Sequence, residues 1–132
     1  MQVGEFCFLD SAPEERPGRV AEEVDEAANG VGLTLVAVEA GRVIGMGKVA
    51  LAGEHAWLHN MNVREGFRGR GVGAELTRRL AAMARQSGAR RMFAHVRADN
   101  AAARRAYEKA GMRCCCVDGM RGEQLRYGME LA

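Results

Sequence analysis

The chain has 132 residues, of which 48% are hydrophobic and 27% are charged. This length suits one domain spanning residues 1–132, and the composition excludes a disordered chain. No apolar run approaches the roughly 18 residues that a membrane span needs, and Met1–Asp10 lacks the basic and apolar segments of a secretory signal. We therefore expect a soluble, cytoplasmic protein without a membrane partner.

The charge is unevenly distributed along the chain, although the net charge is only +2. Residues 1–60 hold 10 acidic and 4 basic side chains, whereas residues 61–132 hold 7 acidic and 15 basic ones. The basic half favours an anionic ligand, either a nucleic acid or a phosphorylated small molecule. The alternative is that the two halves are simply solvated faces of one domain.

Cysteine usage argues against disulfides and metal sites. The four cysteines are Cys7, Cys114, Cys115 and Cys116. Consecutive cysteines do not form a set of ordinary disulfides, and none has the CxxC spacing of a zinc or redox site. We expect no metal and interpret all four as small apolar side chains, buried in a protein of a reducing compartment.

Hydrophobic patterning in the first half of the chain predicts mainly strands. Gln2–Leu9 is predicted as a short strand and Glu14–Ala28 as a helix. Leu33–Val38 and Val43–Leu51 are rich in aliphatic residues and flank a turn, which predicts a hairpin. A further apolar strand is predicted at His55–Val63.

The second half of the chain predicts helices alternating with strands. The apolar stripe of the first helix consists of Val72, Leu76, Leu80 and Met83. Gly88 closes this helix, and a second helix begins at Asp99 or Asn100 as N-cap and ends at Gly111. The predicted strands are Arg91–Arg97, Met112–Val117 and Leu125–Leu131. The class is therefore mixed α/β (α+β) with a partly antiparallel sheet.

A glycine-rich segment between a predicted strand and a predicted helix has the features of a phosphate-binding loop. Gly69, Gly71 and Gly73 let the backbone approach a ligand closely, and the following helix adds the positive end of its dipole. The segment lacks GxxxxGK[ST], which excludes a P-loop, and it also lacks the GxGxxG spacing of a Rossmann site.

Two motifs resemble the GNAT superfamily of N-acetyltransferases. Arg68-x-x-Gly71-x-Gly73 is similar to its acyl-CoA signature, [Q/R]-x-x-G-x-[G/A]. The segment from Asn100 to Met112 is similar to a second signature, N-x-x-A-x-x-x-Y-x-x-x-G-F, with Met112 in place of the aromatic residue. The resemblance covers about residues 33–131. It implies a largely antiparallel central sheet that is splayed in the middle, flanked by helices and preceded by a short N-terminal region.

The resemblance also implies a binding site for acetyl-CoA as co-substrate. The residues whose backbone would hold the pyrophosphate are Arg68, Gly69, Arg70, Gly71, Val72 and Gly73. The thioester would lie near the backbone of Met61, Asn62 and Val63, where a bulge separates this strand from Met92–Val96. Asn100 would touch the cofactor arm, and either Arg70 or Arg104 would reach the nucleotide phosphates.

Acetyl transfer to an amine needs a neutral amine and a proton donor for the departing thiolate. The resemblance places Tyr107 near the sulfur, which makes it the candidate acid; the alternative is an aromatic side chain that only packs against the core. His59, with a reference pKa of about 6.5, is the candidate base or member of a water relay. The alternatives are a core histidine and a reaction that needs no protein base.

The region before Leu33 is shorter than in the family, with room for one strand and one helix. The acceptor pocket is then unusually open, completed by a second subunit or built differently, and Leu125–Leu131 is a candidate strand for a homodimer. The acceptor, a small-molecule or peptide amine, stays open. The competing interpretations are an acyl-CoA sensor without turnover and a nucleic-acid-binding protein. The second is disfavoured because the aromatic residues are few and scattered.

Overall fold

The computed structural model describes residues 5–8, 31–118 and 124–131. The predicted helix Glu14–Ala28 lies outside the described residues. The described elements are β1 (Glu5–Phe8), β2 (Val31–Glu39), β3 (Arg42–Ala52), β4 (His55–Val63), α2 (Val72–Gln86), β5 (Arg91–Arg97), α3 (Ala101–Lys109), β6 (Arg113–Asp118) and β7 (Gln124–Glu130). Each one matches an expected element to within a few residues.

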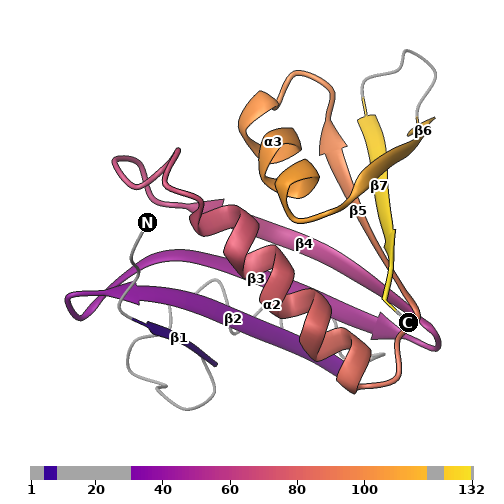
Figure 1. Cartoon of the computed structure of the whole chain (residues 1–132), viewed down its shortest axis with the longest axis horizontal. Helices are drawn as coiled ribbons and strands as arrows, with labels where there is room; N and C mark the ends of the chain where they lie inside the picture. Colours follow the sequence, from indigo (N-terminus) through magenta and orange to yellow (C-terminus); the bar gives the residue numbers. More distant parts are fainter. Residues whose placement is uncertain (1–4, 9–30, 119–123, 132) are drawn as a thin grey trace.

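The strands form one mixed sheet with the order β1-β2-β3-β4-β5-β7-β6 (Figure 1). Every neighbouring pair is antiparallel except β4 and β5, which are parallel. The β2–β3 hairpin turns at Ala40 and Gly41, whose φ angles are 51° and 76°. Two consecutive positive φ angles belong to the tight turn whose twist matches that of paired strands. The predicted hairpin and fold class are confirmed.

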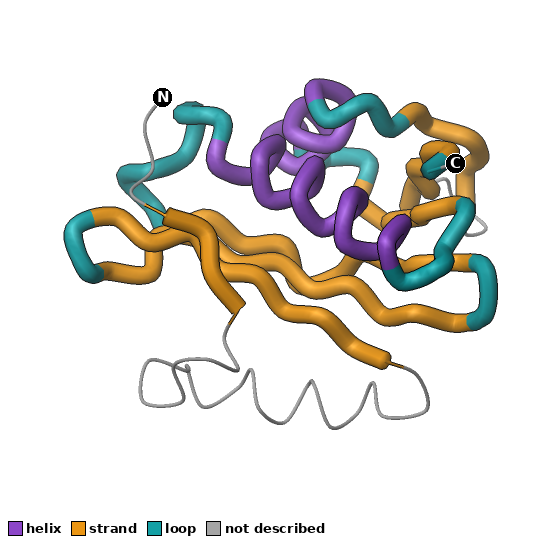
Figure 2. Tube along the Cα trace, turned by 60° about the horizontal axis from the view of Figure 1, so that its bottom comes forward, coloured by secondary structure: helices purple, strands orange, loops and turns teal. Residues whose placement is uncertain are grey.

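Both described helices cover the same face of the sheet (Figure 2). Helix α2 packs against β2, β3 and β4 and also contacts α3. Its stripe residues Leu76 and Leu80 are fully buried together with Ile44, Val49 and Met92 from the strands. Burial of these aliphatic side chains, worth about 1.5–3 kcal/mol each, holds α2 on the sheet.

The sheet opens between β4 and β5. These strands pair only where His55–Leu58 lies beside Arg91–Ala94, and beyond that point their ribbons diverge (Figure 1). β4 has a bulge beside this opening. Met46 of β3 pairs with Asn62 and Lys48 pairs with His59, so one residue of β3 lies opposite two residues of β4. Asn60, within the bulge, has a φ of 52°, a left-handed conformation that is uncommon for a residue with a side chain.

The cysteine run does not lie in the core. Cys114 and Cys115 are exposed, so the prediction that they are buried is wrong. Both belong to β6, which is an edge strand of the sheet. Cys115 is the extra residue of a bulge against β7, and its thiol donates to the Arg126 carbonyl at 3.2 Å. The side chains of Cys7 and Cys116 lie outside the described residues.

Within the described ranges, no helix has both the length and the apolar composition that crossing a membrane requires.

Candidate functional site

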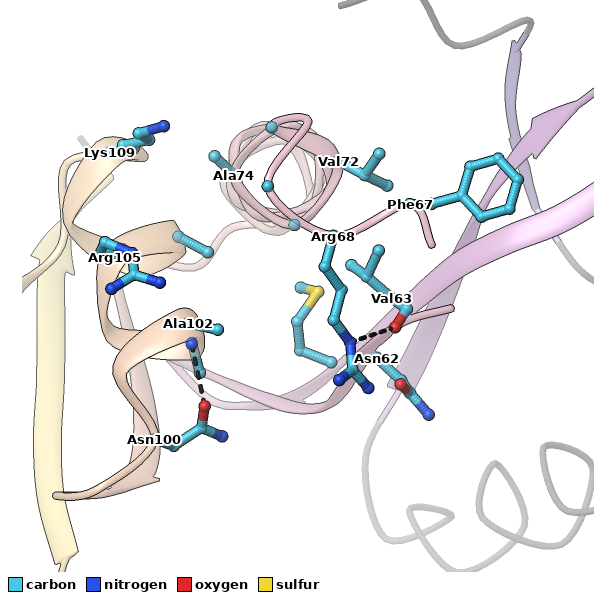
Figure 3. A pocket seen from close by; sticks show the side chains of 16 residues that line it. Asn62, Val63, Phe67, Arg68, Val72, Ala74, Asn100, Ala102, Arg105 and Lys109 are labelled. Atoms are coloured by element: carbon cyan, nitrogen blue, oxygen red, sulfur yellow. Dashed lines mark hydrogen bonds between the residues drawn. The ribbon is translucent and has the colours of Figure 1, made fainter. Parts of the chain in front are cut away.

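The first cavity, which we call the loop cavity, lies between the N-terminal end of α2 and one face of α3 and has a volume of about 330 Å³. Its floor is the end of β4, and its rim is the glycine-rich loop at residues 64–71 (Figure 3). The predicted cofactor-contacting residues that line it are Met61, Asn62, Val63, Arg68, Gly69, Gly71, Val72, Gly73 and Asn100. Two segments distant in the sequence, residues 61–74 and residues 100–109, therefore converge on one cavity.

The loop presents the start of α2 to this cavity. Gly71, the N-cap residue, is left-handed with a φ of 84°, and no side chain caps the helix. The first intrahelical bond runs from the Glu75 amide to the Gly71 carbonyl at 3.0 Å. Among the residues that the structure describes, no side chain accepts from the N–H groups of the first turn, and together with the helix dipole these groups suit an anion.

Gly73 lets α2 and α3 approach each other next to the cavity. A Cβ atom at this position would lie 3.3 Å from the Ala106 Cβ and 3.7 Å from a methyl group of Val63. The first distance is tighter than ordinary van der Waals contact, so a side chain here would push the two helices apart. The second glycine of the signature thus serves the packing that shapes the cavity.

Three cationic side chains border the loop cavity. Arg68 extends from the loop, and its Nε donates to the Val63 carbonyl at 3.0 Å. Arg105 and Lys109 face it from α3 across the cavity (Figure 3). All three are exposed. Sequence analysis did not assign Arg105 or Lys109 to the cofactor, although their spacing of four places both on one helical face.

Arg70 and Arg104, the residues expected to reach nucleotide phosphates, do not line a described cavity. The Arg70 guanidinium pairs with Glu39 at 3.1 Å and lies 5.1 Å from the Phe67 ring centre. The Arg104 side chain donates to the Tyr127 hydroxyl at 3.2 Å and to the Ala98 carbonyl at 3.0 Å. Since one residue along α3 rotates the side chain by about 100°, Arg105 faces the cavity and Arg104 does not.

A second cavity, which we call the strand cavity, has a volume of about 400 Å³ and lies where β4 and β5 diverge. Both predicted catalytic residues, His59 and Tyr107, line it. Leu58 belongs to the core beneath the helices, so the alternation of a strand turns Trp57 and His59 to the opposite face of the sheet. Since Asn100, Ala103 and Tyr107 of the α3 segment also line it, the strand cavity extends through the opening of the sheet from the helix side to the opposite face.

Tyr107 projects from α3 into the wall of the strand cavity. Its side chain is only 4% exposed, and its ring centre lies 5.9 Å from that of Tyr127. Burial raises the pKa of the Tyr107 phenol to about 12, because the ionised form would lose its hydration. The phenol is therefore neutral at physiological pH and is a hydrogen-bond donor there.

His59 is half-buried at the bulge of β4. The Asn60 amide nitrogen lies 3.1 Å from the His59 Nδ1. The role of Nδ1 in this contact depends on the tautomer of the ring, and a neutral imidazole accepts a proton at whichever nitrogen carries none. The structure thus brings His59 and Tyr107 to one cavity from separate elements.

Aromatic rings from neighbouring strands form part of the strand cavity. Trp57 on β4 stacks on His95 of β5, with ring centres 5.4 Å apart and an interplanar angle of 25°. Phe93 lies 5.1 Å from Trp57. The parallel pairing of β4 with β5 creates this cluster, which sequence analysis did not find because the rings are distant in the chain. In the parts of the chain that the structure describes, no group of three or more potential metal ligands occurs.

The two cavities meet. Met61, Asn100 and Ala103 line both of them. Asn100 also caps α3, with its side-chain oxygen accepting from the Ala103 amide at 3.1 Å. A ligand bound on the helix side of the sheet can therefore present one end to a second molecule in the strand cavity.

Comparisons with known proteins agree with this architecture. A family model described as acetyltransferase (GNAT) family matches residues 5–112. An IAA acetyltransferase from Bacillus cereus is 20% identical, with a TM-score of 0.73 over 96% of this chain and 97% of that one. The PaiA N-acetyltransferase of Thermoplasma acidophilum in complex with coenzyme A is 16% identical, with a TM-score of 0.73 over 85% and 69% of the two chains.

An aminoglycoside 6'-N-acetyltransferase complexed with coenzyme A is 17% identical, with a TM-score of 0.71 over 94% of this chain and 86% of that one. At these identities the likeness shows the fold. Among curated proteins, no significant sequence match is found.

Proposed function

Because the chain belongs to the GNAT family of acetyltransferases, we propose that it transfers an acetyl group from acetyl-CoA directly to an amine. Acyl transfer from coenzyme A is the general reaction of the family, so the chain is expected to be an enzyme. The observation that carries the proposal is the junction of the two cavities at Met61, Asn100 and Ala103. The loop cavity suits an anionic donor, and the strand cavity suits an acceptor.

The proposal assigns the pyrophosphate of coenzyme A to the loop cavity. The uncapped first turn of α2 supplies backbone donors. Arg68, Arg105 and Lys109 supply positive charge on both sides of the cavity, which suits the several phosphate charges of the cofactor. This assignment gives a role to three of the 15 basic side chains in residues 61–132.

The pantetheine arm is assigned to the opening of the sheet. Beyond Leu58, β4 no longer pairs with β5, so its backbone at residues 60–63 has no neighbouring strand on that side. The amide groups of the arm pair there as an added strand would. The thioester then lies beside the β4 bulge, at the entrance to the strand cavity.

The proposed reaction needs few protein groups. The amine nitrogen attacks the thioester carbon, the carbon–sulfur bond breaks, and the thiolate gains the proton that the amine loses. An alkyl ammonium with a pKa of about 10.4 must first be deprotonated, at a cost of about 4.6 kcal/mol at pH 7. We assign this deprotonation to His59, directly or through water. Tyr107 donates a hydrogen bond to the departing sulfur.

Thermal unfolding with and without acetyl-CoA tests the donor site, with ADP as the control ligand. At 100 times its Kd, acetyl-CoA is expected to stabilise the fold by about 2.7 kcal/mol, which is several degrees for a chain of this size. Lys109→Ala should reduce the shift. Arg85→Ala, near the C-terminal end of α2 and outside both cavities, is the matched control.

A screen for release of coenzyme A with a panel of amines tests turnover. No thermal shift at millimolar acetyl-CoA would refute the donor site. A shift without turnover on any amine would favour an acyl-CoA-binding sensor instead. The amine acceptor, the cytoplasmic location, the homodimer and the absence of a nucleic-acid partner stay predictions.

A further inference from the structure

The residues at the junction of the two cavities would surround the acyl group of a bound acyl-CoA. An acyl group on a sulfur at the end of the loop cavity must lie at this junction to meet an amine in the strand cavity. Of the residues that line both cavities, Met61 has the only long apolar side chain. Asn100 is held by its capping bond, and Ala103 has only a methyl group.

The Met61 side chain lies directly on the backbone of Gly47 in the neighbouring strand. A Cβ atom at Gly47 would be 2.7 Å from the Met61 Cε and 3.3 Å from its Sδ. The same atom would be 2.9 Å from a methyl group of Leu80, which is fully buried on α2. Met61 therefore fills a slot whose floor is a glycine and whose end is a core leucine.

The β4 bulge accounts for this contact. The register shift leaves Asn60 and Met61 opposite the single residue Gly47. The extra residue turns Met61 towards the face that the helices cover, where it packs against the core. The bulge that opens the sheet thus also aims a flexible side chain into the floor of the junction.

We propose that Met61, seated on Gly47, sets the length of the acyl chain and restricts the donor to short acyl groups such as acetyl. This inference rests on the proposed function. A longer acyl chain would have to enter either the slot above Gly47 or the strand cavity. Met61 already fills the slot, and in the strand cavity the acyl chain would displace the amine. In hydrophobic pockets each methylene changes selectivity by about 10- to 200-fold.

Met61→Ala removes Cγ, Sδ and Cε and leaves a space with no side chain on its floor. The measurement is the Kd of acetyl-CoA, butyryl-CoA and hexanoyl-CoA by isothermal titration calorimetry, which needs no acceptor. We expect Met61→Ala to tighten butyryl-CoA relative to acetyl-CoA by about tenfold or more. Met61→Val, a shorter residue compatible with a strand, should shift the ratio in the same direction.

Gly47→Ala should act in the opposite direction, because its Cβ displaces the Met61 side chain into the junction. We expect this variant to weaken butyryl-CoA more than acetyl-CoA. Met83→Ala is the matched control. Met83 packs partly buried on α2 and lies outside both cavities, so the ratio of the two dissociation constants should not change.

The outcomes separate the two proposals. If Met61→Ala and Met61→Val change the ratio no more than Met83→Ala does, the role of Met61 is refuted while the donor site stands. If the wild-type protein binds neither coenzyme A nor any acyl-CoA, the proposed function itself fails. Retained acetyl-CoA binding together with tighter butyryl-CoA binding in both Met61 variants supports the inference.

Discussion

Replacing Tyr107 by Phe removes a single hydroxyl from the strand cavity. The ring keeps its buried position and its packing 5.9 Å from Tyr127, so the unfolding free energy should change by less than about 1 kcal/mol. The expected effect is on the rate. Tyr107→Phe should lower kcat by roughly 100- to 1,000-fold, the loss typical of one donor at a developing negative charge.

The pKa of Tyr107 decides how this hydroxyl acts. With a phenol pKa of about 12 and a thiol pKa of about 8.5, complete proton transfer to the thiolate is uphill by about 3.5 units, or roughly 5 kcal/mol. Tyr107 therefore stabilises the departing sulfur by a hydrogen bond, and the proton that ends on sulfur comes from the amine. Because the phenol stays neutral well above pH 9, the loss in Tyr107→Phe should be the same from pH 6 to 9.

Steady-state rates with acetyl-CoA and an active amine test this prediction. Coenzyme A should be quantified by chromatography, because the exposed thiols of Cys114 and Cys115 would react with thiol reagents. The Kd of acetyl-CoA should be unchanged. A loss of less than about threefold in kcat, or a loss that varies with pH over this range, would refute the assigned role.

Two further predictions concern stability. Tyr127→Phe removes a hydroxyl that donates to Glu108 at 2.6 Å and accepts from Arg104 at 3.2 Å; urea unfolding should show a loss of about 1.5–3 kcal/mol, and a loss below 0.5 kcal/mol would contradict the network. Gly71→Ala, at a φ of 84°, should cost about 1–2 kcal/mol and weaken coenzyme A binding. Gly53→Ala, at a φ of 61° in open space, should cost a similar amount and leave binding unchanged; equal effects on binding would contradict a ligand role for Gly71.

Features that depend on near neighbours in the chain could be predicted from the sequence. The period of Val72, Leu76 and Leu80 predicts α2 because these residues share one helical face. Asn100 was one of two candidate caps, and the structure shows its side chain accepting from Ala103. The glycine loop between a strand and a helix was visible for the same reason: its glycines and the helix start lie within a few residues of each other.

Features that depend on strand order and on the packing of distant elements could not be predicted from local sequence patterns. Exposure of Cys114 follows from the place of β6 at the edge of the sheet, which a local pattern does not encode. The choice between Arg104 and Arg105 depends on what lies beside each face of α3. The contact of Met61 with Gly47 requires the β3–β4 pairing and its bulge. The spacing of hydrophobic residues predicts whether a segment is a helix or a strand and which of its faces is buried. The residues that contact that face depend on strand pairing and on packing between segments distant in the sequence.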